Sequence, residues 1–301
     1  MLGTGNAISQ TALYSGQRAL PLFGAVAGSL YALFGVGNLL AGYTGPFERW
    51  RRATDNDQQD VWWDGSTVRL GGGEVVTGWL AGGNAYQVTR YDHTRQGHDA
   101  TQATASAQPR TALAGVVDVG PNGKPVAVFS GAQFLEVQNA LGFSRLAAAL
   151  TVAANIKATG AGTQFVFTTQ VAASTSTRAT FAYIGGSTTI SVQGRQQDGY
   201  ALTTASTTVT SLEWARLIAR ARYAGGYMDI AANGAALTSV SMLGFSGAPS
   251  NTPDTDSFSP PRIGASASGA SFLTGQIGTL ALARTALDPT LTDAALLKTA
   301  A

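Results

Sequence analysis

The stretch ARYAGGYMDIAANGAAL (Ala221–Leu237) decides the fold, because it holds two turn signals around one short strand. Gly225-Gly226 predicts a turn after a strand that ends at Tyr223. Asn233-Gly234 predicts a second turn, since both central residues of this hairpin type need positive φ. The strand Tyr227–Ala231 lies between the two turns. The stretch therefore predicts a meander of three strands.

The same alternation of short strands and turns continues along most of the chain. The segment DVWWDGSTVRL (Asp60–Leu70) predicts a strand, a turn at Asp64-Gly65 and another strand. Helical periodicity is restricted to Leu146–Ala154 and to the C-terminal DPTLTDAALLKTA (Asp288–Ala300). Many short strands joined by glycine-rich turns are typical of a sandwich or a barrel, so we expect an all-β fold.

The composition fits one large domain, or one domain with an appendage. Charged residues are 12% of the 301 residues, against a usual share of about 25%. The absence of cysteine excludes disulfides, thiol chemistry and cysteine-based zinc sites. The 19 basic and 17 acidic residues are interspersed, which argues against a nucleic-acid binder. The one dense basic run is Arg49, Arg51 and Arg52.

The N-terminal segment Ala19–Gly42 is uncharged and long enough to cross a bilayer, which takes about 20 apolar residues. It is diluted by five glycines, a proline, a serine and an asparagine. We expect a helix or extended arm buried in an assembly, because a segment that is apolar on all faces must be buried. The expected regions are an attachment and oligomerisation arm over 1–42, a tryptophan-rich connecting region over 43–83, and a sandwich over 84–301.

Four segments carry a resemblance to a known family. They are LYALFGVGNLLAGYTGPFERWRRATDNDQQDV (Leu30–Val61), TRYDHTRQGHDATQATASAQPR (Thr89–Arg110), NGKPVAVFSGAQFLEV (Asn122–Val137) and RIGASASGASFLTGQIGTLAL (Arg262–Leu282). With these segments the chain resembles the concanavalin A-like (laminin-G-like) jelly-roll domain of phage or gene-transfer-agent fibre and spike proteins. It is distantly similar to the catalytic domain of arabinofuranosidase B. The resemblance implies a jelly-roll β-sandwich.

Two departures from the family pattern shape the functional expectation. The family's first motif has an arginine-bearing helix, whereas Tyr31–Ala41 has no charge, which suggests that a partner subunit covers this face. The arabinofuranosidase catalytic carboxylates correspond to Thr180 and Ser266. Glycoside cleavage normally needs two carboxylates, so we expect a protein that is not an enzyme. Glu74, Glu136 and Glu213 are scattered, and their spacing marks out no pair.

Candidate binding residues follow from aromatic and acidic side chains. Sugars present a flat C–H face to aromatic rings, and Trp62, Trp63, Trp79 and Tyr86 lie in or next to the turn-rich region. Trp62 and Trp63 are neighbours on a strand and face opposite ways, so at most one belongs to the core. We expect no cofactor. Asp254 and Asp256, in a polar loop, are a weak candidate for Ca²⁺.

The segment RYDHTRQGHDATQ (Arg90–Gln102) contains both histidines of the chain. A metal site would need Asp92, His93, His98 and Asp99 to converge, but neighbours on a strand face opposite ways. The family pattern has no histidine at these positions, so we expect His93 and His98 in an exposed turn. Asp92 is expected to accept backbone N–H groups of the following turn, and Tyr91 to pack inward.

These observations favour a virion or phage-like particle fibre or spike that binds host surface polysaccharide without cleaving it. Residues 1–42 would attach it to other particle proteins or to sister chains, with a homotrimer expected from the resemblance. The location would be the particle surface, outside the cell. One alternative is a glycoside hydrolase on an arabinofuranosidase-like scaffold. The other is a membrane-tethered bacterial surface lectin.

Overall fold

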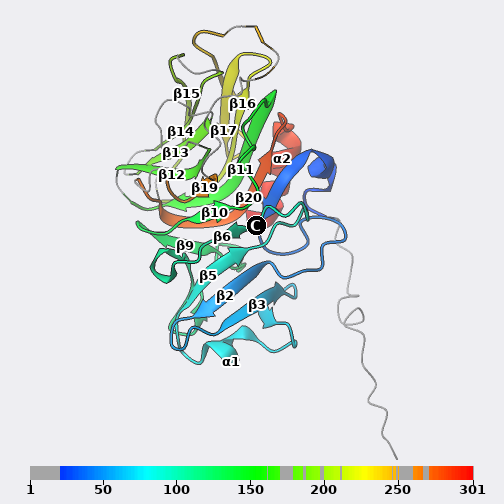
Figure 1. The fold of residues 1–301 in the computed structure, drawn as a ribbon, viewed down its shortest axis with the longest axis vertical. Coiled ribbons are helices and arrows are strands. Elements are labelled where there is room, and N and C mark those ends of the chain that lie inside the picture. Colours follow the sequence, from blue (N-terminus) through cyan, green and yellow to red (C-terminus); the bar gives the residue numbers. More distant parts are fainter. Residues whose placement is uncertain are drawn as a thin grey trace, which may run out of the picture.

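Antiparallel strands form most of the protein, as the computed structural model shows (Figure 1). The structure describes residues 21–300 except 161, 170–178, 186–187, 197–199, 211, 246, 249, 251–259 and 267–270. Two sheets stack as a β-sandwich in the upper part of Figure 1, and a smaller N-terminal layer lies below them. The all-β sandwich expected from the sequence is confirmed.

The first sheet of the sandwich contains the longest strands of the chain. Its strands, in spatial order, are β1 (Leu30–Phe34), β20 (Thr274–Ala283), β11 (Ala149–Ala158), β16 (Ala215–Arg222), β17 (Tyr227–Ala232) and β18 (Thr238–Ser241). The last three form the predicted meander, which is confirmed. Asn233 and Gly234 have φ of 54° and 77°, as the hairpin signal requires.

The second sheet faces the first across the core. Its strands, in spatial order, are β6 (Ala100–Thr101), β10 (Leu135–Val137), β19 (Arg262–Ile263), β12 (Gly162–Thr168), β13 (Ala179–Gly185), β14 (Thr189–Gly194) and β15 (Thr203–Thr208). Val152 and Ile230 of the first sheet are buried in one cluster with Phe167 and Val192 of the second. Alternation along each strand sends these side chains into the core.

The N-terminal layer is joined to both sheets through strand pairing. Its strands are β2 (Glu48–Arg52), β3 (Gln58–Trp63), β4 (Val68–Leu70), β5 (Ala85–Arg90), β7 (Arg110–Leu113), β8 (Val116–Val117) and β9 (Ala127–Ser130). Strand β5 pairs with β6 at one end and β7 at the other, and β9 pairs with β20. Trp50 is fully buried in the separate core of this layer. The predicted hairpin at Asp64-Gly65 joins β3 to β4 and is confirmed.

Helical elements are few and short, apart from the C-terminal helix. They are η2 (Gly24–Ser29), α1 (Val76–Leu80), η3 (Ala105–Ala107) and α2 (Pro289–Ala300). The predicted C-terminal helix is confirmed by α2, which lies beside η2 in Figure 1. Both cover the outer face of the first sheet, where Ala153 and Ile218 pack against Leu296. Among the described residues, no helix has the length and apolar character needed to span a bilayer.

The helix expected at Leu146–Ala154 is wrong, and of the helix or extended arm expected for the N-terminal segment the structure shows the extended form at β1. Leu146–Ala154 enters strand β11, which pairs with β20 on one edge and β16 on the other. Successive residues of β11 are buried, so both of its faces are covered. Tyr31–Ala41 contains strand β1 and turns instead of a helix. Its apolar side chains pack against the chain's own β20 and α2, so their lack of charge needs no partner subunit. The region boundaries at residues 42 and 83 stay predictions.

Candidate functional site

A line of polar residues crosses the outer face of the second sheet and continues onto the N-terminal layer. We call it the polar row; its members are Asp60, Arg49, Thr89, Thr101, Glu136, Arg262 and Thr168. Each is paired in register with the next, and directly opposite residues of antiparallel strands share a face. Beyond β13 the same register reaches Gln193 and Thr204, which are hydrogen-bonded at 3.0 Å.

The pair Glu136–Arg262 occupies the middle of the polar row. Arg262 donates from Nε and Nη2 to Glu136 Oε1, at 3.1 and 2.8 Å. Its guanidinium lies 4.5 Å from the ring centroid of Phe134. The side chains of Glu136 and Arg262 are 30% and 18% exposed. A carboxylate, a cation and an aromatic ring are therefore held together, and the two charged side chains keep part of their surface exposed.

The two positions that the resemblance assigned to catalytic carboxylates are both connected to Arg262 of this pair. Thr180 is paired by its backbone with Thr168, which is itself paired with Arg262. The carbonyl of Ser266 accepts a hydrogen bond from Arg262 Nη1 at 3.4 Å. The fold thus brings both positions to Arg262, although neither residue is acidic.

Glu136 is the candidate functional residue that sequence reasoning set aside. Among the described strands of the second sheet it is the single carboxylate. Its neighbours Leu135 and Val137 are buried in the core, so alternation places Glu136 on the outer face. It contacts Arg262, which lies opposite it on the neighbouring strand. The sequence signal for Glu136 was a charged residue between two apolar residues of a short strand.

A cavity of about 410 Å³ opens near the polar row, at the junction of the second sheet with the N-terminal layer. Its lining residues are Arg51, Tyr86, Ala105, Ser106, Arg110, Val128, Ser130 and Gln133. Arg51 lies 5.2 Å from the ring centroid of Tyr86. Tyr86 is thus the predicted glycan-binding residue that lines a cavity of ligand size.

The three predicted tryptophans lie apart from this cavity. Trp63 packs against the core of the N-terminal layer, and Trp62 is partly buried beside Gly71. Trp79 also packs on that core, with its indole N–H donating to Asp57 at 2.7 Å and Arg52 over its ring. The structure does not gather Trp62, Trp63, Trp79 and Tyr86 into one site. Their contact with glycan stays a prediction.

The expectation that His93 and His98 occupy an exposed turn is wrong. His93 is 3% exposed and stacks on Tyr43 with ring centroids 4.0 Å apart. His98 is 8% exposed and stacks on Tyr31 at 3.9 Å. Burial lowers the pKa of His93 to about 3, with a further contribution from the charge of Arg90. Both rings are therefore structural parts of the core.

The turn role expected for Asp92 is confirmed. Its Oδ1 accepts the backbone N–H of Thr94 at 2.9 Å and that of Leu33, in β1, at 3.0 Å. The carboxylate thus ties the turn to the sandwich. Tyr91 does not pack inward as expected, since it is only partly buried and its hydroxyl donates to Asp60 at 2.7 Å.

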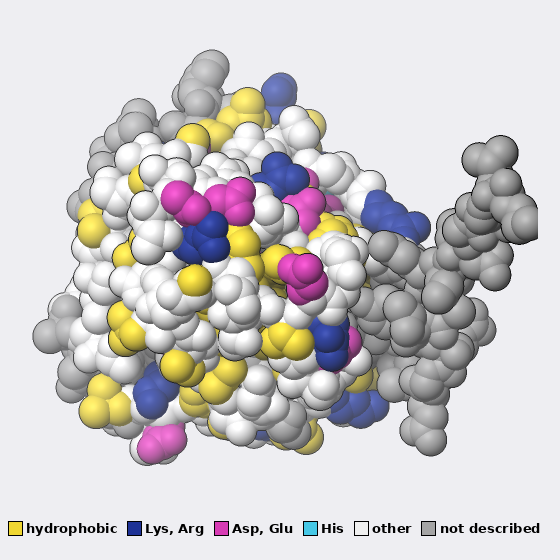
Figure 2. Space-filling model, turned by 90° about the horizontal axis from the view of Figure 1, so that it is seen from below, with side chains coloured by type: hydrophobic (Ala, Val, Ile, Leu, Met, Phe, Trp, Pro, Cys, Tyr) yellow, Lys and Arg dark blue, Asp and Glu magenta, His cyan; other side chains and the backbone are white. Residues whose placement is uncertain are grey.

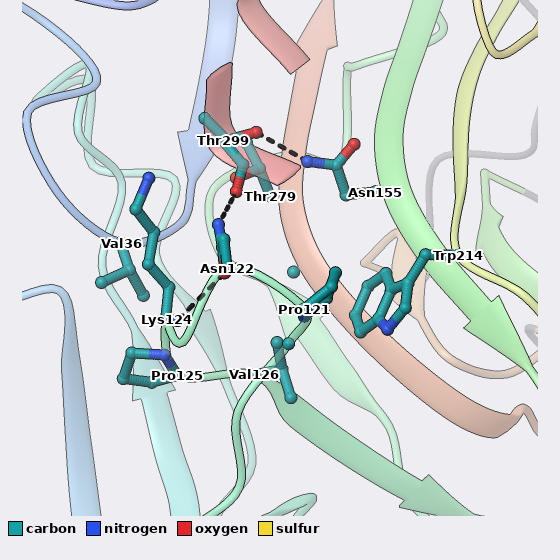
Figure 3. A pocket seen from close by; sticks show the side chains of 12 residues that line it. Val36, Pro121, Asn122, Lys124, Pro125, Val126, Asn155, Trp214, Thr279 and Thr299 are labelled. Atoms are coloured by element: carbon teal, nitrogen blue, oxygen red, sulfur yellow. Dashed lines mark hydrogen bonds between the residues drawn. The ribbon is translucent and has the colours of Figure 1, made fainter. Parts of the chain in front are cut away.

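A second, smaller cavity lies under the end of α2 (Figure 3). Asn122 donates to the carbonyl of Thr299, and Asn155 donates to the Thr299 hydroxyl at 2.6 Å. Trp214 closes the cavity on the side of Pro121 (Figure 3). The volume of about 20 Å³ is the space of a water molecule. These contacts fasten the C-terminal helix and leave no room for a larger ligand.

Acidic and basic side chains lie beside one another at the end of the molecule seen in Figure 2. In the basic run, Arg49 pairs with Asp60 at 2.8 Å and Arg52 with Asp55 at 2.5 Å. Within the ranges that the structure describes, no group of three or more acidic or histidine side chains forms a metal site. The calcium candidates Asp254 and Asp256 lie outside the described residues.

The comparisons with known proteins identify the fold. No family model matches the sequence, and no curated protein matches it. An arabinofuranosidase complexed with arabinofuranosyl-α-1,2-xylobiose matches with a TM-score of 0.63 and 10% identity, over 92% of this chain and 64% of that chain. A GH54 α-L-arabinofuranosidase soaked with a cyclic sulfate inhibitor matches with a TM-score of 0.61, 10% identity and the same coverage.

This chain therefore spans less than two thirds of the length of those enzymes. A smaller match is the Ruminococcus gnavus IT-sialidase CBM40 bound to α2,3-sialyllactose. Its TM-score is 0.47 and its identity 14%, over 58% of this chain and 95% of that chain.

The comparisons correct two expectations. The resemblance to fibre and spike domains of phages and gene-transfer agents is wrong, because the fold shared over most of the chain is that of arabinofuranosidases. The expectation that the protein is not an enzyme is overturned by the same finding. It rested on the side chains at Thr180 and Ser266 and on the lack of a carboxylate pair marked out by spacing, whereas the fold brings Glu136 to the same face as Arg262.

Proposed function

We propose that the protein is a carbohydrate-active protein that binds a saccharide across the polar row and hydrolyses a glycosidic bond there. The observation that carries the proposal is the partly exposed Glu136–Arg262 pair, whose arginine is connected to both positions where the resemblance places catalytic carboxylates. The likeness of the fold to arabinofuranosidases supports it. A furanoside is therefore the first substrate class to test.

The residues of the site suit a sugar ligand. The hydroxyls of Thr89 and Thr101, the amide of Gln193 and the guanidinium of Arg262 are partly exposed and offer donors and acceptors to sugar hydroxyls. The ring of Phe134, next to Arg262, offers an apolar face to sugar C–H groups. Glu136 would act at the anomeric carbon, either as a base that activates water or as a nucleophile. Arg262 orients Glu136 through its two hydrogen bonds.

The leaving group decides how many carboxylates the reaction needs. A second acid has to protonate the leaving oxygen of an ordinary glycoside, whereas 4-nitrophenolate leaves without a proton. An aryl furanoside therefore tests Glu136 by itself. The rate on the aryl substrate divided by the rate on an unactivated oligosaccharide then measures whether another acid takes part.

The test uses Glu136→Gln, with Glu74→Gln as the control because Glu74 is exposed and lies outside the second sheet. We expect wild type to release nitrophenolate from 4-nitrophenyl α-L-arabinofuranoside. Glu136→Gln should lower kcat/KM by a factor of about 100 or more, while Glu74→Gln leaves it unchanged. Affinity electrophoresis against arabinan and arabinoxylan measures binding separately, and Glu136→Gln should still bind.

Wild-type protein that neither releases nitrophenolate nor binds any of these polymers would contradict the proposal. Release that survives in Glu136→Gln would remove Glu136 from the mechanism. The fibre or spike role, attachment through residues 1–42, the homotrimer and the particle-surface location stay predictions from the sequence. Membrane attachment of residues 19–42 also stays a prediction.

A further inference from the structure

The cavity beside Tyr86 is lined by two arginines, and within the described part of the chain one of them has an acidic partner while the other does not. Arg110 forms a two-point ion pair with Asp118, at 2.9 and 3.0 Å, and is therefore neutralised. Arg51 has neutral partners: it donates to Gln108 at 2.8 Å, to Asn56 at 2.9 Å and to the Ala105 carbonyl at 3.4 Å. The cavity thus has one positive charge that the described residues leave without an acidic partner.

The positive charge of Arg51 that the described residues leave unpaired is buried. Arg51 is only 8% exposed, and a buried cation is costly unless a counter-charge comes within reach. A guanidinium has five N–H donors, and Arg51 uses three of them in the bonds above. Donors therefore remain for a ligand in the cavity. A planar guanidinium with free donors fits a carboxylate best, through two parallel hydrogen bonds.

The backbone keeps the cavity and the polar row on one face. Thr89 pairs with Arg49, Gln87 with Trp50, and Tyr86 with Arg51, so Val88 is an extra residue in the pairing of β5 with β2. Because of this bulge, Tyr86 and Thr89 share a face although three positions separate them. Their partners Arg49 and Arg51 are two positions apart, so at about 3.3 Å per residue roughly 7 Å separates Tyr86 and Thr89 along the strand.

The segment that leads into β10 lies beside the cavity as well. Gln133 lines the cavity, and Glu136 lies three residues further along the chain. Gln133 uses its amide oxygen to accept from the backbone N–H of Ser130, at 2.7 Å, and from the Ser130 hydroxyl, at 3.0 Å. Two separate chain segments therefore place the cavity within the reach of one short oligosaccharide that also covers Glu136.

We propose that this cavity binds the carboxylate of a uronic acid unit in the same saccharide that lies across the polar row. Arg51 receives the carboxylate, and Tyr86, Ser106 and Gln133 surround the sugar ring. The ligand class is thus an acidic saccharide. The identification as a sugar rests on the proposed function, whereas the preference for an anion rests on Arg51 and the cavity alone.

The experiment compares two ligands by titration calorimetry. One is a tetrasaccharide in which glucuronic acid alternates with a neutral sugar, and the other is the same compound after reduction of its carboxylates to alcohols. We expect the acidic form to bind wild type with a Kd about tenfold lower or better, because hydrogen bonds to charged groups are the stronger ones. Raising the salt concentration should narrow this difference.

Two arginine variants locate the effect. Arg51→Gln should remove the preference for the acidic ligand and leave the Kd for the reduced one within about twofold. Arg69→Gln is the matched control, because Arg69 lies in the same N-terminal layer but pairs with Asp64, outside both the cavity and the polar row. It should keep the preference. A circular dichroism melt checks that Arg51→Gln is folded.

The outcomes separate the two proposals. Equal binding of both ligands to folded wild type overturns the acidic-saccharide proposal and leaves the proposed function standing. Binding of neither ligand, together with no hydrolysis, overturns both. Tighter binding of a sulfated analogue than of the uronate, still dependent on Arg51, would overturn the assignment to a carboxylate. Loss of the preference in Glu136→Gln as strongly as in Arg51→Gln would also contradict a separate anion site.

Discussion

Replacement of Glu48 by glutamine is expected to change how the stability of the protein depends on pH. Glu48 is 1% exposed; its Oε2 accepts the indole N–H of Trp50 at 2.6 Å, and its Oε1 lies 3.5 Å from Arg90 Nε. Burial raises the pKa of Glu48 from 4.5 to about 7, against the opposing effects of Arg90 and Trp50. The carboxyl is therefore uncharged in the folded state at mildly acidic pH.

The size and sign of the effect follow from these two pKa values. Between pH 4.5 and 7 the folded state holds a proton that the unfolded state has released, so the free energy of unfolding falls as pH rises. The contribution is fully present below the unfolded pKa and is lost above the folded one. One unit of pKa corresponds to about 1.4 kcal/mol, so the loss is about 3 kcal/mol.

The variant has to be compared with wild type at each pH because another buried group acts in the opposite direction. The pKa of His93 is lowered from 6.5 to about 3 by burial and by Arg90. The unfolded state therefore binds a proton that the folded state does not, and this contribution increases stability as pH rises from 3 to 6.5. Subtracting the two proteins cancels it and leaves Glu48.

Urea denaturation of wild type and Glu48→Gln at pH 4.5 to 8 gives the measurement. We expect the free energy of unfolding of the variant, minus that of wild type, to rise by about 3 kcal/mol across this range. The constant cost of placing an amide beside Arg90 does not alter that rise. In wild type, the indole N–H resonance of Trp50 should titrate with a midpoint near 7. A flat difference, or one that falls with pH, would refute a protonated Glu48 in the folded state.

Three further predictions concern residues that hold the fold. His93→Ala should cost about 2–4 kcal/mol of unfolding free energy in urea, since a buried stacked ring is lost; no change would favour the exposed turn. Asp92→Ala should cost about 1–3 kcal/mol, because Leu33 N–H loses its partner, and hydrogen exchange should speed up at that amide. Gly275→Ala should cost about 3 kcal/mol or more by melting, as its Cβ would overlap the Lys157 carbonyl.

The strands that sequence predicted correctly are those whose signals are local. Asn233-Gly234 needs two successive residues at positive φ, and the hairpin follows from that requirement alone. Leu146–Ala154 was mistaken for a helix for the opposite reason. Strand β11 is buried on both faces between β16 and β20, so its sequence has no alternation, and its alanines mimic a helix former.

The apolar N-terminal segment shows the same limit. Its lack of charge correctly indicated burial for β1, although Ala25 and Ala27 of η2 are exposed. Periodicity does not tell which surface covers a segment. Strand β1 pairs with β20, which comes more than two hundred residues later, and η2 packs beside the C-terminal helix. Both contacts depend on the far end of the chain. An external partner was therefore inferred where the protein's own C-terminus supplies the contact.

The candidate site was missed because it is formed by register between distant strands. Glu136 and Arg262 are separated by 126 positions, and their contact exists because β10 and β19 pair with these residues opposite each other. When catalytic residues are transferred position by position, only Thr180 and Ser266 are asked whether they carry a carboxylate. On a sheet face, however, neighbouring strands present side chains at the same level.

The chemistry of such a face therefore depends on which strand supplies the carboxylate, and not only on whether one aligned position keeps it. Adding a second carboxylate to this face should therefore improve hydrolysis of unactivated substrates. Thr180→Glu introduces a carboxylate at a position that the backbone register places two strands from Arg262, on the other side of Thr168. If hydrolysis at this face needs two carboxylates, Thr180→Glu should raise turnover of unactivated oligosaccharides relative to the aryl furanoside. No change in that ratio would mean that the second group already comes from elsewhere in the chain.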